Sequence, residues 1–332
     1  MESKLLTRTL PIVTAKQAAE LALKEIEEGR SGIQRSLLTR WKHVNNLLVG
    51  GFRFGNTYVL GGMSGGGKSY KLNMLREDFL NKELNSMFTK PFRLIHFAME
   101  MSASDEVLRT VGGNIKTSYQ SLISAFRKLP DQKFTEAMAY LESMKHLDMD
   151  FVEVTGNVLQ LKQTILEYQA KYPGINLIVS LDHTLLTDYL NEKDEIQLVT
   201  NVSKMFLSAR KEIGCMGIIV AQLNDKIEDI SRIGKANFHY PTKKDIHGAK
   251  AIYRDADCVM VLHDPSQLGI RRYGPESNPD GQGGLGYTTE DRVFLHVLKM
   301  RKGVPGMIVF TQDFKNGNLH EEIINAPRLV IE

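Results

Sequence analysis

The sequence has little cysteine, no long apolar run and no secretion signal, and each absence excludes a class of protein. Its two cysteines, Cys215 and Cys258, lie in apolar runs typical of core strands. We predict that both are buried thiols, which fits a reducing compartment. No run reaches the roughly 18 apolar residues that a membrane helix needs, and the N-terminus lacks the apolar core of a signal peptide. We therefore expect a cytoplasmic protein with no membrane partner.

Net charge is also small. The 332 residues include 42 Lys and Arg against 39 Asp and Glu, which gives a formal charge of +3. This value does not indicate a general nucleic-acid binder, so any basic surface must be local. The hydrophobic fraction of 42% and the charged fraction of 24% are typical of globular proteins, and the length suits one large or two ordinary domains.

A phosphate-binding pattern is the strongest signal in the chain. The stretch Gly62-Met63-Ser64-Gly65-Gly66-Gly67-Lys68-Ser69 fits G-x-x-x-x-G-K-[ST]. The β-branched and aromatic run 57–60 before it predicts a short buried strand. The spacing of Leu72, Leu75 and Phe79 after it predicts a helix from Ser69 to about Lys82. A strand, a glycine loop and a helix in this order predict a nucleotide site, although a glycine-rich turn that binds nothing is the alternative.

The pattern assigns each residue type a role toward ATP and Mg²⁺. Glycines let the backbone N–H groups point inward toward phosphate, at the positive end of the helix dipole. Lys68 should reach the β- and γ-phosphates, and the Ser69 hydroxyl should bind Mg²⁺. The candidate ATP-binding residues of this segment are Gly62, Ser64, Gly65, Gly66, Gly67, Lys68, Ser69 and Tyr70.

Strand and helix patterns alternate through the rest of the chain. Strands are expected at 92–98, 151–154, 175–181, 217–221 and 258–262, helical segments at 102–147, 158–172 and 195–213, and a closing hairpin at 293–300 and 307–310. This alternation predicts an α/β fold with a mostly parallel sheet. In such sheets, ligands bind beyond the carboxyl ends of the strands.

Three polar residues are expected at that edge. Asp182 follows an apolar strand and is predicted to hold Mg²⁺; the alternative is a strand-ending turn residue. Glu100 is placed to activate the water that attacks the γ-phosphate; the alternative is a carboxylate that stabilises a helix N-terminus. Gln222 has an amide that suits a γ-phosphate sensor, although a strand-end glutamine is usually just solvated.

Two long loops follow these strands. Residues 224–247 combine basic side chains, Lys235, Lys243 and Lys244 among them, with Phe238 and Tyr240, a mixture that suits single-stranded nucleic acid. Acidic residues dilute that charge, so a plain solvated loop is the open alternative. Residues 264–291 are rich in glycine, and we assign them no chemistry.

The N-terminal arm begins with a T-x-x-Q capping box at Thr14 and Gln17, and Gly29 is an expected helix stop. One side of its helix carries Ala15, Ala19, Ala22 and Ile26, a narrow apolar face. The sequence leaves open whether that face packs on its own domain or on a neighbouring subunit. A second helix is expected near residues 40–48.

Taken in order, these segments resemble the ATPase domain of the DnaB-family hexameric replicative helicases, a RecA-like fold. The resemblance extends from about Leu37 to the C-terminus, which leaves 1–36 as an arm and 37–332 as the ATPase domain. Its motifs are the entry segment 41–47 before Gly50-Gly51-Phe52, Ala98-Met99-Glu100-Met101, Val220-Ala221-Gln222-Leu223-Asn224, Asp255-Ala256-Asp257 and Lys299-Met300-Arg301-Lys302-Gly303.

The resemblance implies roles for individual residues. Glu100 becomes the catalytic base, Asp182 the Walker B acid and Gln222 the sensor. Arg109 falls where the family's next helix has an arginine and is a further candidate ATP-binding residue. Lys299 and Arg301 match the pair that reaches into the neighbour's ATP site. The resemblance also implies a homo-oligomer, expected to be a hexamer, that binds single-stranded DNA and has a primase or a helicase loader as a further partner.

Two departures from the family limit these expectations. We expect no counterpart of the family's N-terminal helical domain, which engages primase, and this shortness suggests a phage or mobile-element version; a phage version would act in the host cytoplasm. The segment equivalent to the family's DNA loop, 245–250, lacks an arginine but adds His247 and Lys250 to the candidate DNA contacts. A RecA-like strand-exchange ATPase and an ATP-gated assembly factor are the competing hypotheses.

Overall fold

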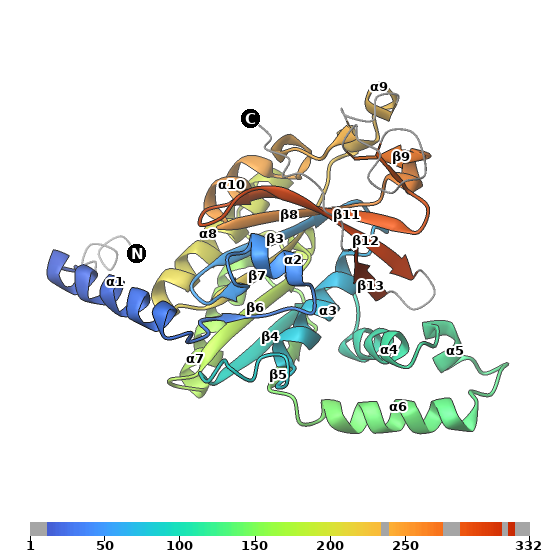
Figure 1. The fold of residues 1–332 in the computed structure, drawn as a ribbon, viewed down its shortest axis with the longest axis horizontal. Coiled ribbons are helices and arrows are strands. Elements are labelled where there is room, and N and C mark those ends of the chain that lie inside the picture. The colour runs from blue at the N-terminus through green and yellow to red at the C-terminus, as the bar shows by residue number, and fades with distance from the viewer. Residues whose placement is uncertain (1–11, 234–238, 275–285, 314–317, 323–332) are drawn as a thin grey trace.

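The computed structural model describes residues 12–233, 239–274, 286–313 and 318–322. Within these ranges one sheet of nine strands forms the centre of the molecule (Figure 1). In spatial order its strands are β13 (Asn318–Glu321), β12 (Gly306–Asp313), β11 (Arg292–Met300), β8 (Cys258–His263), β3 (Thr57–Gly62), β7 (Met216–Gln222), β6 (Asn176–Asp182), β4 (Phe92–Ala98) and β5 (Met149–Val152).

The strands of this sheet from β8 to β5 run parallel to one another, and β11, β12 and β13 form an antiparallel extension at one edge. Two short antiparallel ribbons lie apart from it. One consists of β1 (Ser36–Leu37) and β2 (Phe52–Arg53), and the other of β9 (Arg272–Tyr273) and β10 (Tyr287–Thr288).

Alternate side chains of the central strands enter two different cores, because successive residues of a strand point to opposite faces. In β3, Tyr58 and Leu60 pack on one face and Val59 on the other. The first core is covered by α2 (Lys42–Leu47) and α3 (Lys68–Leu80), and the second by α7 (Val158–Lys171), α8 (Glu195–Ile213) and α10 (Ala249–Asp255). This layered sheet confirms the predicted α/β class and the mostly parallel sheet.

The region 102–147 is helical, as predicted, but it is divided into three helices. They are α4 (Ala103–Asn114), α5 (Tyr119–Ile123) and α6 (Asp131–Met144), and they extend from one end of the sheet (Figure 1). A small cluster around Val111, Ile115 and Ala137 holds α4 and α6 together.

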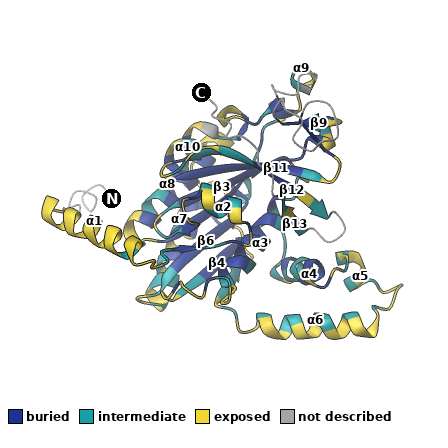
Figure 2. Ribbon diagram, in the orientation of Figure 1, coloured by how far each residue is buried: buried dark blue, intermediate teal, exposed yellow. Residues whose placement is uncertain are grey.

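The arm helix α1 (Ala15–Arg30) begins with the predicted capping box of Thr14 and Gln17 and ends one residue beyond Gly29. None of its residues is buried, and Figure 2 shows it projecting from the body. Leu23 and Ile26, one turn apart, are 56% and 61% exposed. Of the two interpretations left open by the sequence, the described structure therefore gives no packing of this face on its own domain.

Several strand boundaries differ from the sequence prediction, and β5 is shifted as a whole. β5 begins at Met149 and ends at Val152, two residues before the predicted position, because all four of its residues are only half-buried and give no clear alternation. The closing hairpin is found as predicted, but β13 pairs with β12 and extends it. Both cysteines are free and buried, as predicted.

The loop 224–247 is less irregular than the sequence suggests. It contains the short turns η3 (Asp225–Glu228) and η5 (Lys243–Asp245) and the one-turn helix α9 (Ile230–Ile233). Two further turns, η2 (Thr184–Leu186) and η6 (Pro265–Leu268), follow β6 and β8. No helix in the described ranges is both long and apolar enough to cross a membrane.

Candidate functional site

The glycine loop between β3 and α3 has the tight backbone that its sequence predicts. Gly65 and Gly67 have φ values of 69° and 76°, in the left-handed region where a side chain is strained. A Cβ on Gly62 would lie 2.8 Å from Lys68 Cγ, so the strand end also has no room for one. The free N–H groups at the start of α3 therefore face a compact loop, the arrangement that binds phosphate at a helix N-terminus.

Lys68 points back into this loop. Its side chain is buried, and Nζ donates to the carbonyl of Met63 at 2.6 Å. Burial lowers the pKa of Lys68, while the negative charges of Asp182 and Glu100 oppose that change. The Lys68 ammonium group therefore contacts the loop and is close enough to Asp182, the predicted Mg²⁺ ligand, and Glu100, the predicted base, to feel their charge.

Asp182 is the last residue of β6 and is 3% exposed. Burial raises its pKa, and a hydrogen bond with Ser69 opposes that change. Its Oδ1 atom has no hydrogen-bond partner among the described residues. A buried carboxylate oxygen without a partner, beside a hydroxyl, supplies the hard oxygen ligands that Mg²⁺ prefers, so the residues present fit that ion.

Glu100 and Gln222 reach the same edge from β4 and β7, the strands on either side of β6. Ala98 of β4 lies beside Asp182 in the sheet, and Gly62 of β3 lies beside Gln222 of β7. Glu100 follows β4 and is exposed. The structure thus brings the carboxylates, the amide and the phosphate loop together, and their individual roles stay predictions.

His183 is a site residue that the sequence analysis missed. It is 7% exposed, and its Nδ1 accepts from the N–H of Leu185 at 3.3 Å. Its Nε2 lies 3.3 Å from the Gln222 amide, so it joins the Asp182 strand to the predicted sensor. Burial lowers the pKa of His183. Its position directly after Asp182 was the one available sequence signal.

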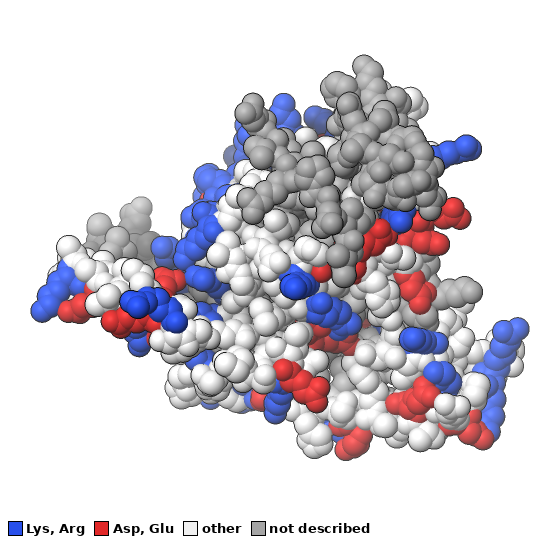
Figure 3. All heavy atoms as spheres, viewed as in Figure 1, with Lys and Arg blue, Asp and Glu red and all other residues white. Residues whose placement is uncertain are grey.

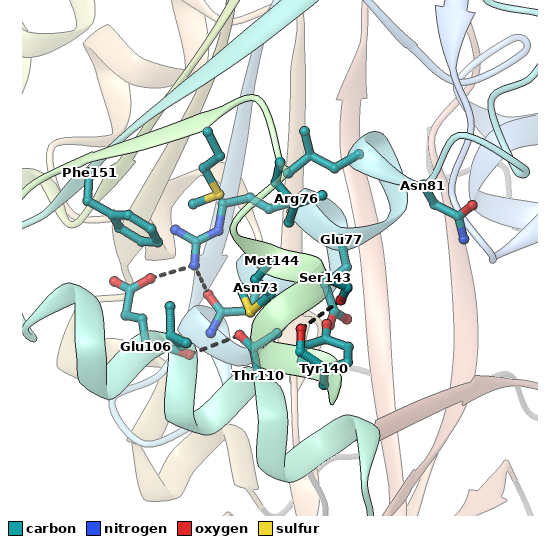
Figure 4. Close-up of a pocket in the computed structure, with 14 residues that line it drawn as sticks. Asn73, Arg76, Glu77, Asn81, Glu106, Thr110, Tyr140, Ser143, Met144 and Phe151 are labelled. Atoms are coloured by element: carbon teal, nitrogen blue, oxygen red, sulfur yellow. Dashed lines mark hydrogen bonds and ion pairs between the residues drawn. The ribbon is translucent and has the colours of Figure 1, made fainter. Parts of the chain in front are cut away.

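A buried polar network behind the phosphate loop was also missed. Arg76 of α3 donates to Asn73 on the same helix and to Glu106 of α4 at 2.5 Å (Figure 4). His96 of β4 contacts the other Glu106 oxygen at 2.9 Å and the Ser180 hydroxyl at 2.8 Å. The sequence did not indicate this role for His96. Its neighbours in the sequence are apolar, and its hydrogen-bond partners are distant along the chain.

The charges in this network depend on one another. Burial alone raises the pKa of Glu106, but the hydrogen bond from His96 and the charge of Arg76 outweigh it and bring that pKa to about 2. Burial lowers the pKa of His96, so this imidazole is neutral near pH 7. The network thereby ties the phosphate-loop helix to α4 and to the strand that ends before Glu100.

A cavity of about 280 Å³ lies beside this network, between α3, α4, α6 and β5. Its polar wall residues bond to one another: Tyr140 donates to Glu77 at 2.5 Å, and Thr110 donates to the carbonyl of Glu106 at 2.9 Å (Figure 4). The cavity lies behind the phosphate-loop helix rather than over the loop, and we assign it no ligand.

Arg109 lies on α4, one turn after Glu106, and is half-buried. Burial raises the pKa of Tyr70, and the charge of Arg109 opposes that change. Tyr70, in the first turn of α3, and Arg109, on α4, were both predicted to bind ATP. The charge of Arg109 therefore acts on Tyr70 across these two helices.

Lys299 and Arg301 lie near the end of β11 and contact α10 rather than the phosphate loop. Lys299 Nζ donates to the carbonyls of Tyr253 and Arg254, the latter at 3.1 Å, and Arg301 Nη2 donates to Arg254 O at 2.9 Å. The side chain of Arg301 is 46% exposed, and its Nε lies 3.6 Å from Asp257. Lys and Arg side chains line the edge of the molecule over α8 and α10 (Figure 3).

The candidate nucleic-acid residues have different environments. Lys243, Lys244 and Lys250 are exposed, whereas Lys235 lies outside the described residues. His247 is half-buried, with Nε2 2.9 Å from Glu195 Oε2. Its backbone N–H donates to Gln222 O at 2.9 Å, so this loop is anchored at the end of the sensor strand.

Comparisons with known proteins agree with this architecture. The family described as the DnaB-like helicase C-terminal domain matches residues 36–316. A search of curated proteins gave no match. One solved structure, described as an ATPase domain, is similar with a TM-score of 0.75 and 15% identity, over 93% of this chain and 99% of that chain.

A second solved structure, a DnaB-like replicative helicase described with its interactions with primase, is similar with a TM-score of 0.72 and 14% identity. The similarity covers 96% of this chain and 69% of that chain. At these identities the two structures show the fold, which is the RecA-like fold predicted from the sequence. Because the family match covers most of the sequence, the chain belongs to the family of DnaB-like helicase C-terminal domains.

Proposed function

We propose that this protein is the ATPase subunit of a ring-forming DNA helicase that moves on single-stranded DNA. The observation that carries the proposal is the division of its candidate catalytic residues between two places. Lys68, Asp182 and Glu100 gather at the phosphate loop, whereas Lys299 and Arg301 lie at the far end of α10. A site that needs both sets is completed by a neighbouring copy.

The part of the site that lies on one subunit binds ATP and activates the attacking water. The backbone N–H groups at the start of α3 and the Lys68 ammonium hold the β- and γ-phosphates of ATP. Ser69 and Asp182 would hold Mg²⁺, which neutralises phosphate charge when bound. Glu100, exposed at the end of β4, accepts the proton of the attacking water, and Gln222 contacts the γ-phosphate.

The part of the site that comes from the neighbouring subunit, the trans part, supplies positive charge. A guanidinium beside the γ-phosphate stabilises the charge that develops there, and such arginines contribute about 10³–10⁵-fold in other P-loop enzymes. Arg301 is sufficiently exposed to reach a second subunit, unlike Arg76, which is 4% exposed. Hydrolysis would therefore depend on contact between subunits.

The arm supports the same assembly. Leu23 and Ile26 expose a continuous apolar face on α1, and three ion pairs to Arg35 and Arg53 hold the C-terminal part of this helix against the body. We propose that the face packs on the next subunit of a homo-oligomer, which we expect to be a hexamer. One solved relative is a helicase with primase interactions, and we propose a primase or a helicase loader as a further partner.

Single-stranded DNA is proposed to contact the loop that leads into α10. Lys243, Lys244 and Lys250 are exposed there, and His247 is held beside them. Cations in such a loop contact backbone phosphates without reading sequence. The loop is joined to Gln222, so DNA contact and nucleotide state are adjacent in the structure.

The test measures ATP turnover with and without single-stranded DNA, alongside the mass in solution by light scattering. We expect turnover that DNA stimulates, a multimeric mass, and no turnover by a folded Lys68→Ala variant. A protein that remains monomeric with ATP and DNA, or hydrolysis by Lys68→Ala near the wild-type rate, would contradict the proposal.

A further inference from the structure

The helix α10 is fixed at its start to the strand that ends at Gln222. Leu223 pairs with Ile246 in an isolated antiparallel bridge, and the N–H of His247 donates to Gln222 O at 2.9 Å. Gly248 follows with a φ of 67°, and a Cβ there would lie 2.5 Å from a Val199 methyl group on α8. The start of α10 is therefore closely packed and cannot move independently of the sensor strand and α8.

At its other end, α10 holds the two cations that we assign to the neighbour's site. Lys299 Nζ and Arg301 Nη2 both donate to the carbonyl of Arg254, at 3.1 and 2.9 Å. This carbonyl belongs to the last turn of the helix, where no intrahelical N–H is available and the dipole is negative. Both side chains are therefore oriented by the C-terminal end of α10.

Tyr253 adds a second connection between α10 and the strand that carries the pair. Its hydroxyl donates to the carbonyl of Leu298 at 3.0 Å, directly before Lys299. The Lys299 ammonium lies 5.2 Å from the centre of its ring, a cation–π distance. One side chain thus joins α10 to β11 through the backbone and contacts the cation next to it.

We propose that Tyr253 is a positioning residue that sets where Lys299 and Arg301 present their charges to the next subunit. Because the segment before α10 is bonded to Gln222 and the end of α10 is bonded to this pair, Tyr253 joins a subunit's own ATP site to the site that it completes in its neighbour. This inference rests on the proposed trans role of Arg301, and it adds a residue that touches neither ATP nor DNA.

Tyr253→Phe is the direct perturbation, because it keeps the ring beside Lys299 and removes the hydrogen bond to Leu298. We expect the DNA-stimulated kcat to fall about fivefold, the rate equivalent of one typical hydrogen bond. The KM for ATP should not change, since the phosphate loop is intact. Tyr253→Leu, which also removes the ring, should lower kcat further.

Tyr168→Phe is the matched control. Its hydroxyl is also bonded within the domain, to Asp150 and to Arg93 Nε at 3.0 Å. Arg93 lies near the amino end of β4 and Asp150 on the neighbouring strand β5, so both are away from the strand end that carries Asp182. We expect this variant to keep the wild-type kcat.

Mixed rings show on which subunit Tyr253 acts. Lys68→Ala subunits can donate Arg301 but not a phosphate loop, whereas Arg301→Ala subunits can donate only the phosphate loop. We expect the activity recovered by mixing them to fall when Tyr253→Phe is added to the Lys68→Ala subunit. The same change on the Arg301→Ala subunit should have no effect.

The outcomes separate this inference from the proposed function. If the parent mixture recovers no activity although the subunits assemble together, the trans role fails and the positioning role fails with it. If activity recovers but Tyr253→Phe has no effect, or has the same effect on either subunit, the positioning role alone is wrong.

Discussion

Glu106→Gln keeps the size of a buried side chain but removes the negative charge that faces Arg76. The two side chains are 6% and 5% exposed, and the guanidinium has one nitrogen, Nη1, with no hydrogen-bond partner among the described residues. Removing one member of a buried ion pair typically costs about 3–5 kcal/mol, because the remaining charge stays buried without compensation. We expect a loss of that size in the free energy of unfolding.

The pKa of Glu106 gives a second route to the magnitude. A fall from the ordinary 4.5 to about 2 corresponds to about 3 kcal/mol in favour of the folded, ionised form. Because the folded pKa is the lower one, this stabilisation is present above about pH 4.5 and is lost as the pH falls toward 2. The difference between wild type and Glu106→Gln should therefore be constant near neutral pH and shrink in acid.

The assay is urea denaturation of both proteins at one concentration, repeated from pH 7 downward. Glu136→Gln is the control, since Glu136 forms a half-exposed pair with Lys133 at 2.7 Å, and its stability should remain close to that of the wild type. Replacing both Arg76 and Glu106 with leucine should cost less than Glu106→Gln alone. A surface ion pair contributes less than about 1 kcal/mol. A loss that small for Glu106→Gln at pH 7 would refute the reasoning.

Three further predictions test the proposed helicase. Glu100→Gln should bind ATP with near wild-type affinity but hydrolyse it about 10²–10⁴-fold more slowly, and a fall of less than about tenfold in single-turnover rate would assign the base elsewhere. Replacing Lys243 and Lys244 with alanine should lower the slope of log K against log salt for single-stranded DNA by about 0.7 for each phosphate that the protein no longer neutralises; an unchanged slope would move the DNA path away from this loop. Ile26→Lys should reduce the mass measured by light scattering, because it places a charge in the exposed apolar face of α1, and an undiminished mass would exclude that face from the interface.

Local sequence patterns predicted the parts of the fold that local chemistry determines. The helix 195–213 and the strand 92–98 are found with the predicted bounds, because a long amphipathic run and a continuous apolar run each have one structural solution. The glycine loop is equally local, since its motif lies within eight consecutive residues. The placement of Glu100, Asp182 and Gln222 at one edge followed from the rule that parallel strands end together.

Contacts between distant segments could not be predicted in this way. His96 is one polar residue in an apolar strand, and its partners Glu106 and Ser180 are 10 and 84 residues away. The hydrogen bond from Lys299 to the Arg254 carbonyl on α10 joins residues 45 positions apart, and no periodicity in the sequence indicates it. The family resemblance pointed to Lys299 and Arg301, but it could not show that Tyr253 of α10 contacts Lys299 and the strand that carries it.

The central claim is that ATP is hydrolysed between subunits, and mixing two inactive variants tests it most directly. Arg301→Ala and Lys68→Ala proteins should each lack ATPase activity alone, for want of the trans arginine and of the phosphate-loop lysine. Rings that contain both variants place an intact Arg301 beside an intact phosphate loop at some interfaces, so part of the activity should return. Full activity of Arg301→Ala alone, or no recovery in rings shown to contain both proteins, would contradict the account.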